Sequence, residues 1–245
     1  MRNAIMAAMV LTLATLAQAG GHWRFERTYV DGEETKTADW SGNGNHGVLV
    51  NGPTLVAGRV GRGMDFFVEA GAVVTSDGPS ITGAITVSVW CYAYSFSSFP
   101  VIIGKGSSHA GTDTATANWS MERASSQLLW RMWEDTGIRT ILYSGAFFLA
   151  DEWIHWTVIW DGTTNEDNLR IYKNGALAAQ SSQDDVSSLK DGPEPIHIGY
   201  DVIRDDARMT WDGVIDEVII TPFAWTAEEV RAYYHSGEVP SRRSE

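Results

Sequence analysis

The segment Trp153–Trp160, with the sequence WIHWTVIW, decides the fold class of this chain. Successive side chains of an extended chain point to opposite faces, so Trp156, Val158 and Trp160 share one face as an apolar stripe. The segment ends at Asp161-Gly162, a dipeptide typical of tight turns. The pattern predicts a β-strand whose apolar stripe packs into the core.

Segments of the same kind recur along most of the chain, separated by clusters of Gly, Asn, Asp and Ser. Ile85–Ala93 alternates in the same way, and Asn174-Gly175 is a strong hairpin signal because both residues tolerate positive φ. The other expected strands are residues 22–26, 64–67, 72–75, 101–105, 118–122, 127–133, 139–144, 169–172, 196–199 and 211–221. About a dozen short strands predict an all-β sandwich or barrel and argue against an α/β fold.

One helix is expected near the C-terminus. Thr226 and Glu229 have the spacing of a capping box, and Gly237 has the position of a helix end. We expect one domain over residues 20–238 and a polar tail at residues 239–245, because a β-sandwich of this size can form a single domain.

The first 19 residues have the features of a signal peptide. Arg2 precedes an apolar run at residues 5–16, and Ala17-Gln18-Ala19 is a small-residue cleavage site. The run is shorter than the about 20 residues that span a bilayer. We therefore expect bacterial export to a secreted or periplasmic location, without membrane insertion; the alternative is a buried N-terminal helix.

Charge and cysteine content limit the possible partners. The net charge of −13 disfavours binding to nucleic acid and to anionic membrane surfaces, and it is compatible with neutral polysaccharide and with cations. The single cysteine, Cys91, allows no intrachain disulfide and is expected to be an inert buried thiol. Stability must therefore come from the core or from a bound metal.

Several motifs in a fixed order carry a resemblance to a known family. They are residues 22–26, 39–47 (DWSGNGNHG), 58–66, 85–90, 104–105, 152–157, 171–175 and 211–218 (WDGVIDEV). In this order the chain resembles the bacterial laminin-G-like, concanavalin A-like jelly-roll domains. The resemblance implies a jelly-roll sandwich of two antiparallel sheets with one short C-terminal helix. It says little about function, because such a fold supports many functions.

The loop at residues 39–47 is the candidate metal site. It contains one carboxylate, two amides and three glycines, and calcium prefers several oxygen ligands. The resemblance implies that this loop meets the closing strand around a structural Ca²⁺ ion. The ligands carried over are Asp39, Asn43 and Asp216, with Asn45 as a further candidate; the alternative is an Asx-type turn beside a hydrogen-bonded Asp216.

The middle of the chain supplies the candidate ligand site. In the segment 127–133, period two places Trp133 and Arg131 on one face and Trp130 and Met132 on the other. A face that carries both tryptophan and arginine is not expected to be core, so we place it on the concave sheet in contact with ligand. The residues predicted to contact ligand are Trp133, Arg131, Trp119, Glu122, Arg139 and His109; the alternative is ordinary aromatic packing.

Catalytic motifs are missing: the chain has no pair of carboxylates in a glucanase-type strand and no nucleophile elbow. The expected function is a secreted, non-catalytic module that binds a polysaccharide, another glycan or a surface protein, with a structural calcium site. The first alternative is a stand-alone glycoside hydrolase or polysaccharide lyase, whose site could be assembled in space from His109, His155, Arg131, Tyr143 and Glu122. The second is an adhesive or structural surface protein.

Overall fold

The computed structural model describes residues 20–67, 71–76, 78–96, 99–106, 116–137, 139–203 and 206–241. The expected signal peptide and His109 lie outside these residues. Within them, no helix is long and apolar enough to cross a membrane.

Sixteen strands and one α-helix are present in the described residues. The strands are β1 (Gly21–Asp31), β2 (Glu34–Asp39), β3 (Gly47–Val50), β4 (Thr54–Ala57), β5 (Arg62–Asp65), β6 (Ala72–Thr75), β7 (Ile85–Ala93), β8 (Val101–Lys105), β9 (Trp119–Ala124), β10 (Gln127–Trp133), β11 (Arg139–Phe147), β12 (Trp153–Trp160), β13 (Leu169–Lys173), β14 (Ala176–Ser181), β15 (Ile196–Ile198) and β16 (Gly213–Thr221). The helix is α1 (Ala227–Ser236), and a 3-10 turn covers Ala207–Met209.

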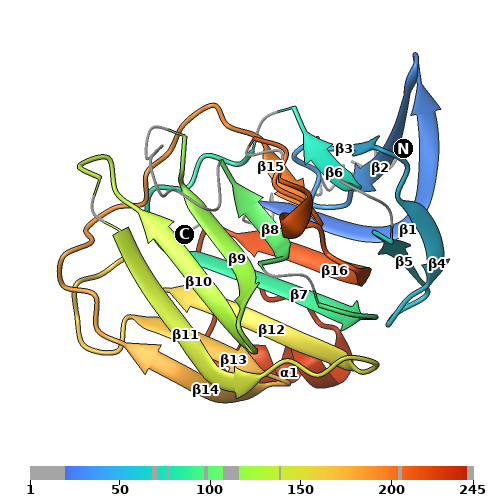
Figure 1. Ribbon diagram of the computed structural model, residues 1–245. Helices are drawn as coiled ribbons and strands as arrows, with labels where there is room; N and C mark the ends of the chain where they lie inside the picture. The colour runs from blue at the N-terminus through green and yellow to red at the C-terminus, as the bar shows by residue number, and fades with distance from the viewer. Residues whose placement is uncertain are drawn as a thin grey trace, which may run out of the picture.

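The strands form two antiparallel layers. One layer has the order β11-β10-β9-β8-β15-β6-β3 and the other has the order β16-β7-β12-β13-β14. The long hairpin of β1 and β2 joins them by hydrogen bonds to both, and the register of β1 shifts between Trp23 and Thr28. Figure 1 shows the β8–β11 layer in front of the β7–β12 layer, with α1 below. This is the predicted concanavalin A-like, all-β fold.

The core fills the space between the layers. Its buried tryptophans include Trp23, Trp130, Trp156 and Trp160, which come from both layers. The predicted stripe of β12 is confirmed, because Trp156, Val158 and Trp160 are all 0–1% exposed. Cys91 also lies in this core, where burial raises the pKa of its thiol well above the usual range, as expected of an inert thiol. Because the single cysteine forms no intrachain disulfide, this core supplies the main hydrophobic stabilisation of the fold.

Helix α1 covers the outer face of the β16-β7-β12 layer. The predicted capping box is present: the Thr226 side chain accepts from the Glu229 amide, and the Glu229 side chain accepts from the Thr226 amide. Val230 and Tyr233 of the helix pack with Ile159 and Ile219 of the sheet in a second apolar cluster. The helix is therefore anchored both by its cap and by burial of one face.

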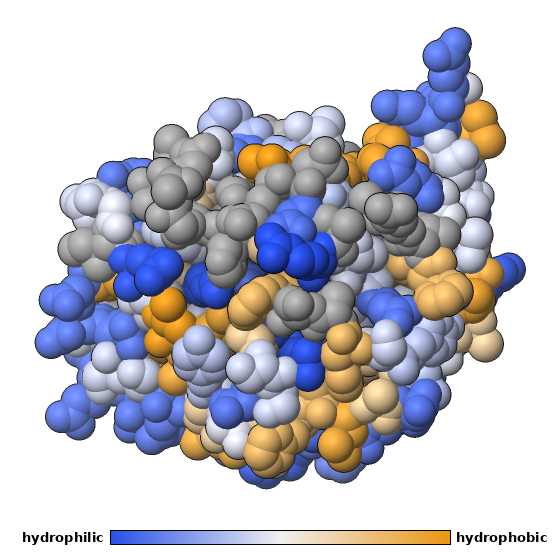
Figure 2. All heavy atoms as spheres, in the orientation of Figure 1, coloured by the Kyte–Doolittle hydropathy of each residue, from blue (hydrophilic) through white to orange (hydrophobic). Residues whose placement is uncertain are grey.

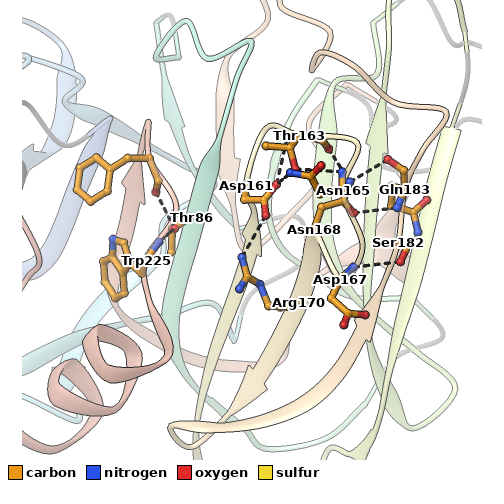
Figure 3. A network of polar contacts seen from close by, with 11 residues as sticks. Thr86, Asp161, Thr163, Asn165, Asp167, Asn168, Arg170, Ser182, Gln183 and Trp225 are labelled. Atoms are coloured by element: carbon orange, nitrogen blue, oxygen red, sulfur yellow. Dashed lines mark hydrogen bonds and ion pairs between the residues drawn. The ribbon is translucent and has the colours of Figure 1, made fainter.

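Side chains close the turns around this layer (Figure 3). In the β12–β13 loop, Asp161 Oδ1 accepts hydrogen bonds from the amide and the hydroxyl of Thr163, and Asn168 bonds the backbone of Gln183 in both directions. Thr86 of β7 donates to Phe223 O and accepts from Trp225 N, which fixes the segment that leads into α1. These contacts position α1 over β7.

Three strands were missed from the sequence: β2, β3 and β4. β2 has the sequence ETKTAD, and most of its side chains are exposed or half-buried. β3 and β4 have only four residues each, and none of the four residues of β4 is buried. Such short or polar strands lack the alternation of buried side chains on which the prediction depended.

His155 predicts how stability depends on pH. Its ring lies under α1, 2.7 Å from Ser88 Oγ, and burial, reinforced by the Arg59 charge, lowers its pKa to about 3. Between pH 6.5 and 3 the unfolded chain binds a proton at this residue that the folded chain does not. His155 should therefore contribute a decrease in the free energy of unfolding as the pH drops below 6.5, of at most about 1.4 kcal/mol per pH unit, and a variant without this residue isolates that contribution.

Urea titrations at several pH values between 6.5 and 5 would measure this slope. His155→Asn should reduce the slope, and His235→Asn, at an exposed position, should leave it unchanged. Equal slopes in the wild type and His155→Asn would contradict the assignment.

Candidate functional site

Trp119, Glu122, Arg131 and Trp133, four of the six residues predicted to contact ligand, lie on β9 and β10 of the front layer, and Arg139 begins β11. Trp130 and Met132 face the core, and Arg131 and Trp133 face away from it, as the period-two pattern predicted. Trp119 also faces the core, where it stacks on Trp130 with ring centroids 5.5 Å apart. Trp119 is therefore a packing residue.

The face of β9 and β10 that turns away from the core is itself buried. Arg131 and Trp133 are only 7% and 1% exposed, and Glu122 is fully buried. The Arg131 guanidinium contacts both oxygens of Glu122 at 2.9 and 2.8 Å, and Ser120 Oγ donates to Glu122 at 2.5 Å. The expected carboxylate, arginine and tryptophan thus converge, but they do not line an open groove.

These residues are buried because later segments of the chain pack over the outer face of this layer. The amide of Lys190 donates to Trp133 O at 2.7 Å, and the Tyr200 and Met209 side chains cluster with Val101 of β8. Of the predicted contact residues within the described chain, only Arg139 is exposed. Figure 2 shows hydrophobic residues at several places on the front face, including its lower edge, among hydrophilic residues. Sequence periodicity gives the face of a strand, but it does not show which loops cover that face.

Charge burial changes the acidity of Glu122. Burial raises the pKa of Glu122 to about 7, while the Arg131 charge opposes that shift. His197, which is fully buried in the same layer, has no hydrogen-bond partner on either ring nitrogen among the described residues, and burial lowers its pKa. The row His197, Gly104, Ser120 and Arg131 runs across β15, β8, β9 and β10. The raised pKa of Glu122 therefore comes from its burial in a closed site, where Glu122, Arg131 and Ser120 form a structural network.

The residues proposed for catalysis do not form one site. His155 packs beneath α1 on the outer face of the back layer, against Trp90 and Tyr233. Glu122 and Arg131 lie in the front layer, on the side turned away from the core. The full thickness of the core therefore separates His155 from Glu122.

The predicted metal loop is held by hydrogen bonds to Asp39. Its Oδ1 accepts from the amides of His22 and Ser41, and its Oδ2 accepts from Ser41 Oγ and the Asn45 amide. Asn45 also ties the loop to the strand, since its Nδ2 donates to Gly20 O and its carbonyl accepts from Trp23 Nε1. These bonds form an Asx-type turn within the loop.

Asp216 lies apart from that loop. Its carboxylate accepts from the amides of Val60 and Glu217, and burial raises its pKa to about 7. β1 lies between β2, which carries Asp39, and β16, which carries Asp216, so the two strand axes are roughly 10 Å apart. Among the described residues, no group of three or more His, Cys, Asp or Glu side chains is placed to hold a metal ion. The loop fits calcium in its oxygen content but not with Asp216 as a shared ligand.

An exposed row of aromatic rings was missed from the sequence. Phe67, Tyr94, Tyr92 and Trp153 follow one another with ring centroids 6.0, 5.8 and 5.7 Å apart. Phe67 and Tyr94 are 68% and 39% exposed, and the other two are half-buried. We call these four residues the aromatic strip. Such a row on a soluble domain indicates a binding surface.

Three strands position the strip on the outer face of the back layer. Tyr92 pairs with Trp153 of β12 on one side and with Val214 of β16 on the other. Tyr94 follows β7 on the same face, and Phe67 follows β5. The rings are therefore carried by paired strands and fixed relative to one another.

Carboxylates border the aromatic strip. Tyr94 donates its hydroxyl to Asp65 Oδ2 at 3.3 Å, and Tyr92 donates to Asp151 Oδ1 at 3.4 Å. Ser95 Oγ donates to Asp212 beside them. Partial burial and Asp65 raise the pKa of Tyr94, so its hydroxyl keeps its proton. Flat apolar rings next to hydroxyl and carboxylate groups can receive the apolar face of a sugar ring and accept bonds from its hydroxyls.

A signal for this site is present in the sequence. Trp90, Tyr92 and Tyr94 occur at every second position, so they must share a face, and that face is opposite Val89, Cys91 and Ala93. The partners Phe67 and Trp153 are distant in sequence and could not be placed beside Tyr94 and Tyr92 without the strand pairing.

Comparison with protein families defines the class. A family model of laminin G type, described as the concanavalin A-like lectin/glucanases superfamily, matches residues 67–231. This chain belongs to that superfamily. A search of the curated proteins finds no match.

Solved structures share the fold at low sequence identity. The binding domain of Paraclostridial Mosquitocidal Protein 1 aligns over 91% of this chain and 52% of its own, with TM-score 0.65 and 16% identity. Domain 4 of AbnA, a GH43 extracellular arabinanase from Geobacillus stearothermophilus solved with arabinotriose, aligns over 88% of this chain and 98% of its own, with TM-score 0.62 and 16% identity. The botulinum neurotoxin serotype D ligand-binding domain, solved with N-acetylneuraminic acid, aligns over 89% and 51%, with TM-score 0.62 and 12% identity. This chain thus spans about half the length of the two toxin domains.

The Glu122–Arg131 pair gives a stability prediction. Arg131→Met leaves the Glu122 carboxylate buried without its partner, which should lower the free energy of unfolding by about 3–5 kcal/mol. The double variant Glu122→Met/Arg131→Met removes both charges and should regain most of that loss. Urea denaturation at pH 8 would measure both, and a double variant no more stable than Arg131→Met would contradict the structural role.

Proposed function

We propose that this chain is a non-catalytic carbohydrate-binding module and that the aromatic strip is its binding surface. The observation that carries the proposal is the partly exposed run of four rings, joined by three successive ring contacts and bordered by Asp65, Asp151 and Asp212. A sugar ring that covers such a surface buries apolar area on both partners, and the flanking oxygens fix its hydroxyls.

The structural neighbours support the same class of ligand. The AbnA domain is nearly matched end to end and was solved with arabinotriose, and the serotype D toxin domain was solved with a sialic acid. Nine of the eleven tryptophans are buried, which leaves Trp40 and Trp153 as the tryptophans that reach the surface. Trp153 lies in the aromatic strip.

Titration calorimetry with arabinotriose, xylotriose, cellotriose and mannotriose would test the proposal. At least one of these should bind, and Tyr94→Ala or Trp153→Ala should weaken that binding about tenfold, because each truncation removes roughly 1.5 kcal/mol of apolar contact.

Tyr143→Ala is the matched control, since Tyr143 is an equally exposed tyrosine on β11 of the other layer (49% exposed). It should bind like the wild type. Equal losses in Tyr143→Ala and Tyr94→Ala, or no loss in Tyr94→Ala, would rule out the aromatic strip. Release of reducing ends or unsaturated products from these sugars would favour the alternative of a polysaccharide-degrading enzyme.

We also propose, from the resemblance, that a calcium ion binds at the loop of residues 39–47. Asp39, Asn43 and Asn45 supply the oxygens there, and Asp216 is too far along the sheet to be shared. Export through the leader at residues 1–19 is proposed from the sequence alone.

The calcium proposal predicts a calcium-dependent melting temperature. A ligand that binds only the folded state stabilises it, by about 2.7 kcal/mol at 100 times its Kd. Excess EDTA should lower the melting temperature of the wild type, and Asp39→Asn should show the same melting temperature with and without calcium. A wild-type melting temperature that does not respond to calcium or EDTA would contradict the calcium proposal.

A further inference from the structure

A cavity of about 490 Å³ opens beside the aromatic strip, between the end of α1 and the β4–β5 turn. Its walls include His22 and Arg24 of β1, Glu217 of β16, Arg59 of the turn, Trp90 of β7 and Tyr234 of α1. This volume lies within the range of about 300–1,000 Å³ that small-molecule sites occupy. Trp90 precedes Tyr92 on the same face of β7, so the cavity and the aromatic strip share one surface.

Two bulges in neighbouring strands shape the wall of this cavity. The register of β1 shifts after Trp23, and the register of β16 shifts after Asp216. Phe25 and Glu217 adopt φ of 52° and 48°, in the left-handed region that costs energy for residues other than glycine. Bulges re-aim side chains and recur beside functional sites.

Glu217 contacts a histidine and an arginine at the cavity. Its Oε2 is 2.9 Å from His22 Nε2, and its Oε1 accepts from Arg24 Nε at 3.2 Å. Glu217 is only 6% exposed, so both of its oxygens are committed to these partners. Arg24 is half-buried and lines the cavity, and it also forms a longer ion pair with Glu26, whose Oε1 lies 3.9 Å from Arg24 Nη2.

Arg59 is a cation without a neutralising partner. It is exposed, and no carboxylate of the described residues lies within 4.0 Å of it, whereas its guanidinium lies 4.5 Å from the centre of the Trp90 ring. Trp90 in turn stacks on Tyr234 at 5.4 Å, which fixes the platform beneath the arginine. A planar guanidinium held on an aromatic ring is suited to bind a carboxylate with two parallel hydrogen bonds.

We propose that this cavity binds the carboxylate of an acidic sugar unit within the glycan that lies on the aromatic strip. The inference rests on the proposed function and specifies its ligand. Arg59 and Arg24 bind the carboxylate, and Trp90 and Tyr234 support the site from below. Asp65, Asp151 and Asp212 border the aromatic strip and repel further anionic units, so the ligand carries its charge at the cavity end and neutral units along the rings.

The probes are a trisaccharide with one galacturonate unit at its end and two neutral galactose units, and the methyl ester of that trisaccharide, because the two share a shape and differ in one charge. Calorimetry on the full chain in 50 mM salt should show the acidic trisaccharide binding at least tenfold more tightly than the ester. Arg59→Gln should abolish that preference and leave binding of the ester unchanged. Arg231→Gln, an exposed arginine of α1 outside the cavity, should keep the preference.

The outcomes separate this inference from the proposed function. Equal binding of acid and ester to the wild type, or an acid preference that survives Arg59→Gln, overturns the carboxylate site. Binding of a neutral trisaccharide that Trp153→Ala weakens, without binding of the trisaccharide that carries one acidic end unit, also overturns it and leaves the proposed function standing. If none of these sugars binds, both fall together.

Discussion

Trp23, Trp130, Trp156 and Trp160 are fully buried in one apolar layer between the two halves of the sheet, and every other feature depends on that layer. The β1–β2 hairpin joins both halves by hydrogen bonds, so it closes the layer along one edge. With a single cysteine there is no disulfide to share the task. Each outward face can therefore vary in chemistry as long as the inward residues continue to fill this space.

The outward faces of the two layers differ in how far their side chains are covered. In front, Glu122 and Arg131 are covered, and their charges compensate one another in a closed network. At the back, α1 covers Ile159 and Ile219 but leaves Tyr92 and Trp153 half-exposed and Tyr94 open. The exposed aromatic rings therefore lie on the side of the sandwich that carries the helix.

The fold was predictable because its signals are local. Alternation in β7 and β12, the Asn174-Gly175 hairpin and the capping box of α1 each require fewer than ten neighbouring residues. The candidate site was not, because it joins Phe67 to Tyr94 and Tyr92 to Trp153 through strand pairing. Burial of Arg131 likewise depends on chain some sixty residues further on, which periodicity does not reveal.

Alternation along β7 has a consequence for how such a domain diversifies. Val87, Val89 and Cys91 face the core, whereas Trp90, Tyr92 and Tyr94 face outward. Neighbouring positions of this strand therefore have different structural roles. Substitutions at the exposed outward position Tyr94 change the outer surface at little cost in folding, whereas a one-residue insertion exchanges the two sets and destroys both. Point mutations can therefore change the outer surface of this strand, whereas its pairing register must stay the same.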